Sequence, residues 1–190
     1  MRLEDLVLTF SYIGIFSVVF AETGLLLGFA LPGDSWLIVI GILAASHKIA
    51  LAPSLLALFL GSFLGNNLGY WLGKALGPGL KARVKPKDYQ TATWFMARFG
   101  FLALLIGPYV PVVRTLVPFV CGATRMPWYR FAILTFFGSL LWTQGLTLLA
   151  YFVGTKIPNL EQYVYLIVAG GALAALVLGG LSRLIRRLKK

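Results

Sequence analysis

The sequence has few of the side chains that soluble enzymes use for chemistry. Among 190 residues there is one cysteine, Cys121, and one histidine, His47. A single cysteine cannot close an internal disulfide, and no paired Cys, His or acidic spacing indicates a metal site or a Ser/His/Asp triad. We therefore expect no metal, no cofactor and no enzymatic activity.

Charge is also scarce. Charged residues make up 12% of the chain and hydrophobic residues 59%, against about 25% and 45–50% in ordinary soluble domains. A soluble domain could not cover so large an apolar fraction, so the sequence indicates an integral membrane protein with one transmembrane domain over residues 1–190. We take Met1 as the mature start, because Glu4 and Asp5 interrupt the basic segment of a signal peptide.

Acidic residues are the rarer of the charged types. Lys and Arg number 17 and Asp and Glu 6, giving a net charge of +11. In a soluble protein this excess would favour nucleic acid as a partner. In so apolar a chain it is typical of the positive-inside rule, and we expect no nucleic-acid partner. The basic connection at 74–93 and the basic C-terminus are therefore expected in the cytoplasm.

Apolar runs of nearly 20 residues predict spanning helices. Four runs qualify, at residues 6–21, 51–72, 131–153 and 163–181. Two further regions, 24–45 and 99–122, are interrupted by proline and glycine, which leaves limbs of about ten residues, or about 15 Å of helix. Such limbs favour re-entrant hairpins buried in protein. Two kinked full spans are the alternative.

The two halves of the chain resemble each other weakly. Gly61-Ser62 recurs as Gly138-Ser139, and the offset between matching segments drifts from 76 to 81. The predicted units are repeat 1 (about 5–73), the basic connection (74–93), repeat 2 (about 94–155) and a C-terminal span with its basic tail (161–190). Because the charges place the two hairpins on opposite sides, we expect an inverted-topology repeat. The predicted fold is an all-α membrane protein with about four spanning helices and two re-entrant helical hairpins.

Three charges, Glu22, Asp34 and Arg114, lie inside apolar regions, and Arg98 lies where the second such region begins. A central charge costs about 2.5–3.5 kcal/mol on insertion scales, so these groups must be paired, hydrated or neutralised. Ionisable groups within the membrane are functional by default. A purely stabilising pair, such as Asp34 with Arg114, is the alternative.

Each of these groups has a candidate role. Desolvation favours the neutral form of a carboxyl, which makes Glu22 a candidate proton carrier. Asp34 follows Pro32-Gly33 at the start of a half-helix, where it could cap the helix or belong to a site. Arg114 lies between prolines on bent backbone, where a guanidinium suits bidentate capture of phosphate.

Asn66 and Asn67 are costly on an apolar helix unless they form hydrogen bonds across helices. They could support the site or the packing. The aromatic residues near the predicted helix ends, Trp71, Trp94, Trp128 and Tyr129, are typical of an interfacial belt.

An ordered set of motifs resembles the DedA family, whose wider group includes the eukaryotic VTT-domain membrane proteins. The motifs are Glu22, Phe29-Ala-Leu-Pro-Gly-Asp-Ser35, Gly65-Asn-Asn-Leu-Gly-Tyr-Trp-Leu-Gly73, Arg98-Phe-Gly and the segment from Val110 to Gly122. The resemblance runs from about residue 10 to 155. It implies a multi-pass protein of the bacterial cytoplasmic (inner) membrane with two facing re-entrant hairpins. It also implies translocation of lipids, notably undecaprenyl phosphate, that depends on proton motive force.

The resemblance assigns proton coupling to Glu22 and Asp34 and binding of the lipid phosphate to Arg114. Arg98 is a candidate second cation, and the supporting residues are Pro32, Gly33, Asn66, Asn67 and Pro111. Two positions depart from the family pattern, since Pro108 stands where an arginine is usual and Asn66 where an aspartate is common. The departures could be the loss of a compensating pair, or could mean an altered substrate or weaker anion capture.

The function we expect is a flippase that moves a polyprenyl phosphate or other anionic lipid with proton coupling. The expected partners are that lipid and the membrane, with a homo-oligomer left open. Alternatives are a proton-coupled cation antiporter, a membrane-bound lipid phosphatase and a non-transporting scaffold. The small number of acidic and histidine side chains argues against the phosphatase.

Overall fold

The computed structural model describes residues 3–25, 33–79 and 85–157, and this part of the chain is helical. The helices are α1 (Leu3–Gly24), α2 (Gly33–Ala45), α3 (Leu51–Leu76), α5 (Pro86–Phe99), α6 (Ala103–Ile106), α7 (Pro111–Ala123) and α8 (Trp128–Lys156). Single 3-10 turns, η2 (Gly77–Gly79), η3 (Gly100–Leu102) and η4 (Gly107–Tyr109), link some of them. The all-helical fold is confirmed. The predicted span at 163–181 and the basic tail lie outside the described residues.

Among the described residues, three helical segments are long and apolar enough to cross a membrane. They are Leu51–Leu76, Pro86–Tyr109 and Trp128–Lys156. The first and third coincide with the spans expected at 51–72 and 131–153. Three shorter apolar helices cover Ser11–Gly24, Asp34–Ala45 and Val112–Ala123. The described part of the chain therefore combines long apolar helices with α2 and α7, whose 13 residues each are too few to cross a bilayer alone.

The segment after the basic connection differs from the sequence prediction. Helix α5 begins at Pro86, inside the stretch expected to be a connection up to residue 93. Proline at the first helical position and Asp88 in the first turn both favour a helix start there. The predicted break near Pro108 and Pro111 is present, because Val110 between them is extended, with φ −113° and ψ 109°.

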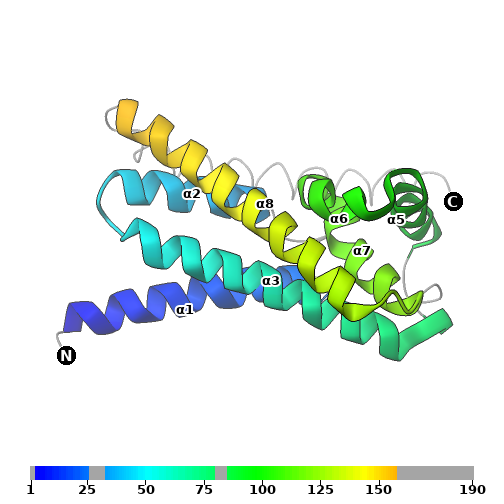
Figure 1. Cartoon of the computed structure of the whole chain (residues 1–190). Helices are drawn as coiled ribbons and strands as arrows, with labels where there is room; N and C mark the ends of the chain where they lie inside the picture. The colour runs from blue at the N-terminus through cyan, green and yellow to red at the C-terminus, as the bar shows by residue number, and fades with distance from the viewer. Residues whose placement is uncertain (1–2, 26–32, 80–84, 158–190) are drawn as a thin grey trace, which may run out of the picture.

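The long helices α3 and α8 cross, and the shorter helices pack against them (Figure 1). Helices α1 and α7 pack on α3, whereas α2 and α6 pack on α8. Glycines allow close crossings on both long helices. A Cβ atom on Gly41 of α2 would lie 2.4 Å from the Thr147 carbonyl oxygen of α8, and one on Gly122 of α7 would lie 1.9 Å from the Tyr70 carbonyl oxygen of α3. Only glycine permits these backbones to approach so closely.

The two halves share local geometry. Helices α2 and α7 both have 13 residues. Each is followed two residues after its end by a residue other than glycine with positive φ, His47 at 56° and Arg125 at 57°. Near the middle of the long helices, the hydroxyl of Ser62 lies 3.1 Å from that of Ser139. These two serines are the pair that the sequence repeat aligns.

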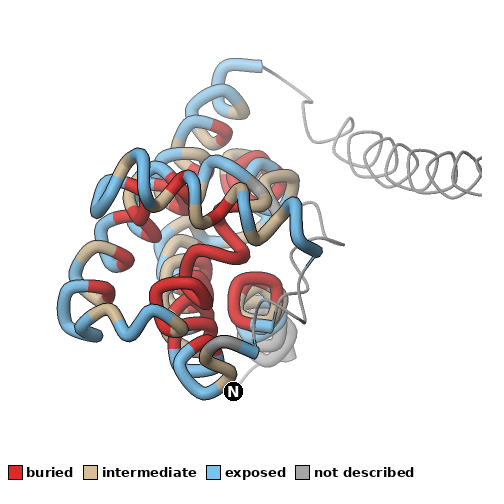
Figure 2. Tube along the Cα trace, turned by 90° about the vertical axis from the view of Figure 1, so that its right-hand side faces the viewer, coloured by how far each residue is buried: buried red, intermediate tan, exposed pale blue. Residues whose placement is uncertain are grey.

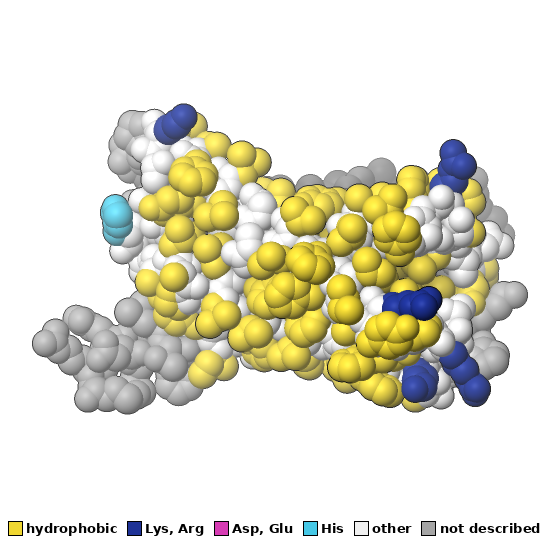
Figure 3. All heavy atoms as spheres, viewed as in Figure 1, with side chains coloured by type: hydrophobic (Ala, Val, Ile, Leu, Met, Phe, Trp, Pro, Cys, Tyr) yellow, Lys and Arg dark blue, Asp and Glu magenta, His cyan; other side chains and the backbone are white. Residues whose placement is uncertain are grey.

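Buried residues lie where the helices meet at the centre of the molecule, and exposed residues lie toward the outside (Figure 2). Much of the outer surface is nevertheless apolar, with large hydrophobic side chains such as Leu56, Ile133, Leu149 and Phe152 more than half exposed. In Figure 3 hydrophobic side chains cover the middle of the face shown, and the Lys and Arg side chains lie toward its ends. An exposed apolar area of this extent fits contact with lipid.

Candidate functional site

Three helix ends bring the buried charges together. Glu22 lies in the last turn of α1, Asp34 in the first turn of α2 and Arg114 in the first turn of α7. The Arg114 Nη2 atom lies 2.5 Å from Glu22 Oε1, and its Nη1 atom lies 2.9 Å from Asp34 Oδ1. The two terminal nitrogens of one guanidinium thus bind two carboxylates from different helices.

Proline positions Arg114. Helix α7 starts at Pro111, which follows extended Val110, and the Arg114 N–H donates to the Val110 carbonyl at 2.8 Å. The fixed φ of proline suits the first position of a helix. The break in the backbone therefore starts a new helix whose first turn presents the guanidinium inward.

The two carboxylates differ in exposure. The side chains of Glu22 and Arg114 are 1% and 4% exposed, whereas that of Asp34 is 45% exposed. The Asp34 side chain is therefore partly uncovered by protein, while Glu22 and Arg114 are enclosed by it. With all three groups ionised, two negative charges face one positive charge, and the cluster carries one net negative charge.

Trp142 completes the cluster from α8. Its Nε1–H donates to Asp34 Oδ1 at 3.1 Å, and the Arg114 Cζ atom lies 4.6 Å from the centroid of a Trp142 ring. The residue is 1% exposed. A guanidinium over an indole face adds a cation–π attraction. Trp142 thus orients both members of the pair and belongs to the site.

Trp142 is not among the site residues that the sequence predicts. A usable signal exists, because Trp142 is the fifteenth residue of a helix that runs from 128 to 156. Tryptophan in membrane proteins is enriched at the two interfaces rather than at mid-depth. A tryptophan at the middle of a span therefore indicates a candidate site residue, as a buried charge does.

A small cavity of about 20 Å³ adjoins Arg114. Its lining includes Asn66, Pro108, Thr135 and Ser139. The Arg114 Nε atom and the Thr135 hydroxyl are buried without a hydrogen-bond partner among the described residues. A volume of this size holds about one water molecule.

The two positions that depart from the family pattern line this same cavity. Pro108 comes from η4 and Asn66 from α3. Since an arginine and an aspartate at these positions would face a shared space, the geometry favours the loss of a compensating pair. The Asn66 amide donates instead to the Ser139 hydroxyl at 3.3 Å.

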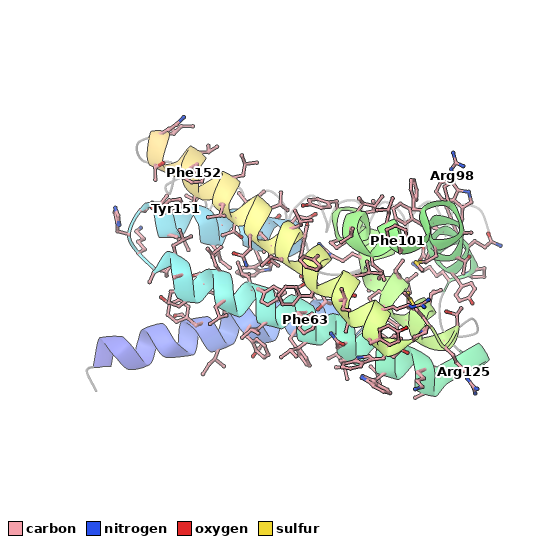
Figure 4. The ribbon with its side chains drawn as sticks, viewed as in Figure 1. Phe63, Arg98, Phe101, Arg125, Tyr151 and Phe152 are labelled. Atoms are coloured by element: carbon pink, nitrogen blue, oxygen red, sulfur yellow. The ribbon has the colours of Figure 1, made fainter. Side chains whose placement is uncertain are left out.

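Other predicted site residues lie elsewhere. Asn67 accepts a hydrogen bond from Trp128 Nε1 at 3.0 Å and donates to the Phe63 carbonyl at 2.8 Å, so it joins α3 to the start of α8. Arg98 is exposed near the end of α5, where Figure 4 shows it directed outward, and the structure does not bring it into the ion pairs of Arg114 with Glu22 and Asp34.

The remaining supporting residues are at the helix starts. Gly33 is the first residue of α2 and Pro111 the first of α7, whereas Pro32 lies outside the described residues. Over the ranges that the structure describes, no group of three His, Cys, Asp or Glu residues could hold a metal ion.

Comparison with known proteins identifies relatives of the chain. Residues 31–152 match the VTT domain. The chain is 30% identical over 182 residues to Protein DedA of Escherichia coli strain K12, covering 92% of this chain and 82% of that protein. It is 32% identical over 157 residues to each of two inner membrane proteins of the same strain, YghB and YqjA, covering 80% of this chain and 71% of each relative. No solved structure matches.

The VTT match spans more than half of the chain and contains Asp34, Arg114 and Trp142. The related inner membrane proteins agree with the several apolar helices of the fold. The chain therefore belongs to the VTT-domain family of membrane proteins, together with the DedA proteins.

Proposed function

We propose that this protein is a proton-coupled transporter of an anionic lipid, of the polyprenyl phosphate class, in the bacterial cytoplasmic membrane. The observation that carries the proposal is the cluster of Arg114 with Glu22 and Asp34 at the meeting point of three helix ends. Intramembrane charges at broken helices are typical of transporter sites. In this proposal the protein is not an enzyme, and the segment at 74–93 and the C-terminus face the cytoplasm.

The arrangement of the helices supports an inverted repeat with two re-entrant hairpins. Helices α2 and α7, with 13 residues each, are about 20 Å long, which is less than the hydrocarbon thickness of about 30 Å. Each packs on the long helix of the other half, α2 on α8 and α7 on α3. The contact between Ser62 and Ser139 is what a two-fold axis between the repeats would produce.

The net charge of the cluster couples proton uptake to the binding of a lipid phosphate. With both carboxylates ionised, the cluster has one net negative charge and both terminal nitrogens of Arg114 are engaged. A lipid phosphate would meet repulsion and an occupied guanidinium. When a carboxyl takes up a proton, it releases one nitrogen and removes one negative charge. Proton uptake and phosphate binding therefore favour each other, and by linkage the coupling is reciprocal.

Protonation of either carboxylate frees one terminal nitrogen of Arg114 for a phosphate oxygen, Nη1 in the case of Asp34 and Nη2 in the case of Glu22. The Nε1–H of Trp142, which donates to Asp34, is a second donor at the same place. The carboxylate that stays ionised continues to orient Arg114.

Loading of the site requires movement. The cavity beside Arg114 is about 20 Å³, and a volume of about one water molecule cannot hold a phosphate group. We propose that α7 separates from the ends of α1 and α2 when the carboxylates are neutral. In alternating access, this cluster would then close to one side of the membrane and open to the other.

Transport by reconstituted protein tests the proposal. Proteoliposomes with a fluorescent polyprenyl phosphate in the inner leaflet are given an imposed pH gradient, and appearance of the probe outside is measured. The parent should move the lipid faster with the gradient than without it, and Arg114→Ala should reduce the rate to that of protein-free liposomes. An Arg114→Ala rate equal to that of the parent would contradict the proposal, and cation-dependent proton flux in vesicles without the lipid would favour an antiporter.

A further inference from the structure

A second basic site lies at the end of the molecule where α3 ends and α8 begins. Lys74, in the last turn of α3, and Arg125, in the loop between α7 and α8, line a pocket of about 440 Å³. Tyr70, Met126, Pro127 and Trp128 form the rest of its wall. Figure 4 shows Arg125 at this end, and Figure 3 shows Lys and Arg side chains gathered there. The site is separate from the Arg114 cluster.

Arg125 occupies a backbone position that normally selects glycine. Its φ is +57°. Its N–H donates to the Gly122 carbonyl at 2.9 Å, and the Met126 N–H donates to the Cys121 carbonyl at 3.0 Å. These two bonds form a Schellman motif that ends α7, in which the left-handed position is usually glycine. An arginine is less stable than a glycine in this backbone conformation, which indicates that the side chain of Arg125 has a role of its own.

The pocket is held in place by hydrogen bonds between elements. The Tyr70 hydroxyl of α3 donates to the Met126 carbonyl, which fixes the loop after Arg125 on α3. The Trp128 indole N–H donates to Asn67 Oδ1 at 3.0 Å, which fixes the start of α8 on the same helix. Both walls are therefore set before any ligand binds.

The cations of this pocket have no anionic partner within the described chain. Lys74 Nζ lies 4.7 Å from the centroid of the Trp71 ring, and both ion pairs found in the described residues belong to Arg114. Helix α8 begins beside the pocket at Trp128 and adds the positive end of its dipole. Two cations and a helix N-terminus thus converge on an empty space suited to a phosphate.

A second, apolar groove lies further along α3 and α8. Phe63 of α3 and four residues of α8, Ala132, Ile133, Phe136 and Phe137, line a space of about 250 Å³. Ala132 and Phe136 follow Trp128 at intervals of four, so they lie on the same face of α8. Trp71 and Trp128, about half exposed beside the pocket, are typical of the membrane interface. A headgroup pocket above an acyl-chain groove fits a lipid better than a free anion.

We propose that the pocket of Lys74 and Arg125 binds the phosphate of an anionic phospholipid, with an acyl chain in the apolar groove. This site requires neither Arg114 nor transport. It would hold the lipid in the leaflet that faces the basic connection, where anionic headgroups attract Lys and Arg.

The test measures lipid binding by the purified full-length chain in detergent. Native mass spectrometry counts bound phosphatidylglycerol, with phosphatidylcholine of the same acyl chains as a neutral comparison and inorganic phosphate as a competitor. The key variant is Arg125→Gly, because glycine is the residue that the backbone at this position prefers. The control is Lys85→Gln/Lys87→Gln, which removes two exposed charges on the same side outside the pocket.

Arg125→Gly should melt at the same temperature as the parent or higher and should bind phosphatidylglycerol about tenfold more weakly, as expected when one charge-assisted contact is lost. The control variant should bind it as the parent does. Equal binding of phosphatidylglycerol by Arg125→Gly and the parent would overturn the proposal. So would equal binding of phosphatidylcholine by the parent, or displacement of the lipid by millimolar inorganic phosphate.

Discussion

Removing Arg114 should leave a buried carboxylate without its counter-charge, and a second substitution should repair the damage. In Arg114→Gln, the Glu22 side chain, which is 1% exposed, loses its cation and either stays charged without a counter-charge or takes up a proton, and both outcomes cost free energy. Breaking a buried pair from one side costs about 3–5 kcal/mol. Asp34 contributes less, because its side chain is 45% exposed and water can replace the guanidinium.

The double variant Glu22→Gln/Arg114→Gln replaces the pair by two neutral amides, so that neither residue leaves a buried charge without its counter-charge. It should therefore recover most of the lost stability, since removing both partners of a buried pair is often close to neutral. Unfolding in detergent, followed by intrinsic fluorescence against temperature and denaturant, measures both variants and the parent. Neither variant should transport lipid, because both lack the cation.

The matched control is Arg98→Gln, which removes an exposed charge of the same type. Its free energy of unfolding should change by less than about 0.5 kcal/mol, as for other surface substitutions. An Arg114→Gln protein as stable as the parent would refute the reasoning, and so would a double variant no more stable than the single one.

Three further substitutions test other parts of the structure. Trp142→Phe keeps a ring for the guanidinium but loses the hydrogen bond to the carboxylate, and should lower the free energy of unfolding by about 1–3 kcal/mol and slow transport in proteoliposomes. Gly122→Ala should destabilise by about 1–3 kcal/mol in thermal unfolding because its Cβ would overlap a carbonyl of α3, whereas Gly14→Ala, with no atom within 4 Å of its Cβ, should not destabilise the fold. Asn66→Asp should destabilise the protein on its own and less when combined with Pro108→Arg, so a double-variant cycle with no interaction energy would contradict a lost pair.

The charges of the site could be predicted because each is costly where it stands. Glu22, Asp34 and Arg114 are ionisable side chains in apolar runs, and a local role, as the cap of a helix, is available only to Asp34. Their meeting could not be predicted from spacing, because Arg114 is 92 residues from Glu22 and 80 from Asp34. It depends on where three helices end, which is set by packing on α3 and α8.

The start of α5 is a local feature that the sequence prediction missed. The basic residues before Pro86 are typical of a loop, but the proline and Asp88 that follow are helix-start signals within the same polar stretch. The composition of residues 74–93 as a whole is typical of a loop, but the helix-start residues Pro86 and Asp88 determine the local structure. Similarly, the shared cavity of Asn66 and Pro108 depends on how η4 meets α3, and no local pattern in the sequence encodes that contact.

Proton uptake on lipid binding tests the central claim most directly. Polyprenyl phosphate is added to weakly buffered, detergent-solubilised protein at pH 8, above the second ionisation of a phosphate monoester at about 6, and a pH indicator records the protons taken up. The parent should take up protons as the lipid binds, and Glu22→Gln/Asp34→Asn should bind the lipid without taking them up. Binding by the parent with no proton uptake would contradict release of Arg114 by protonation.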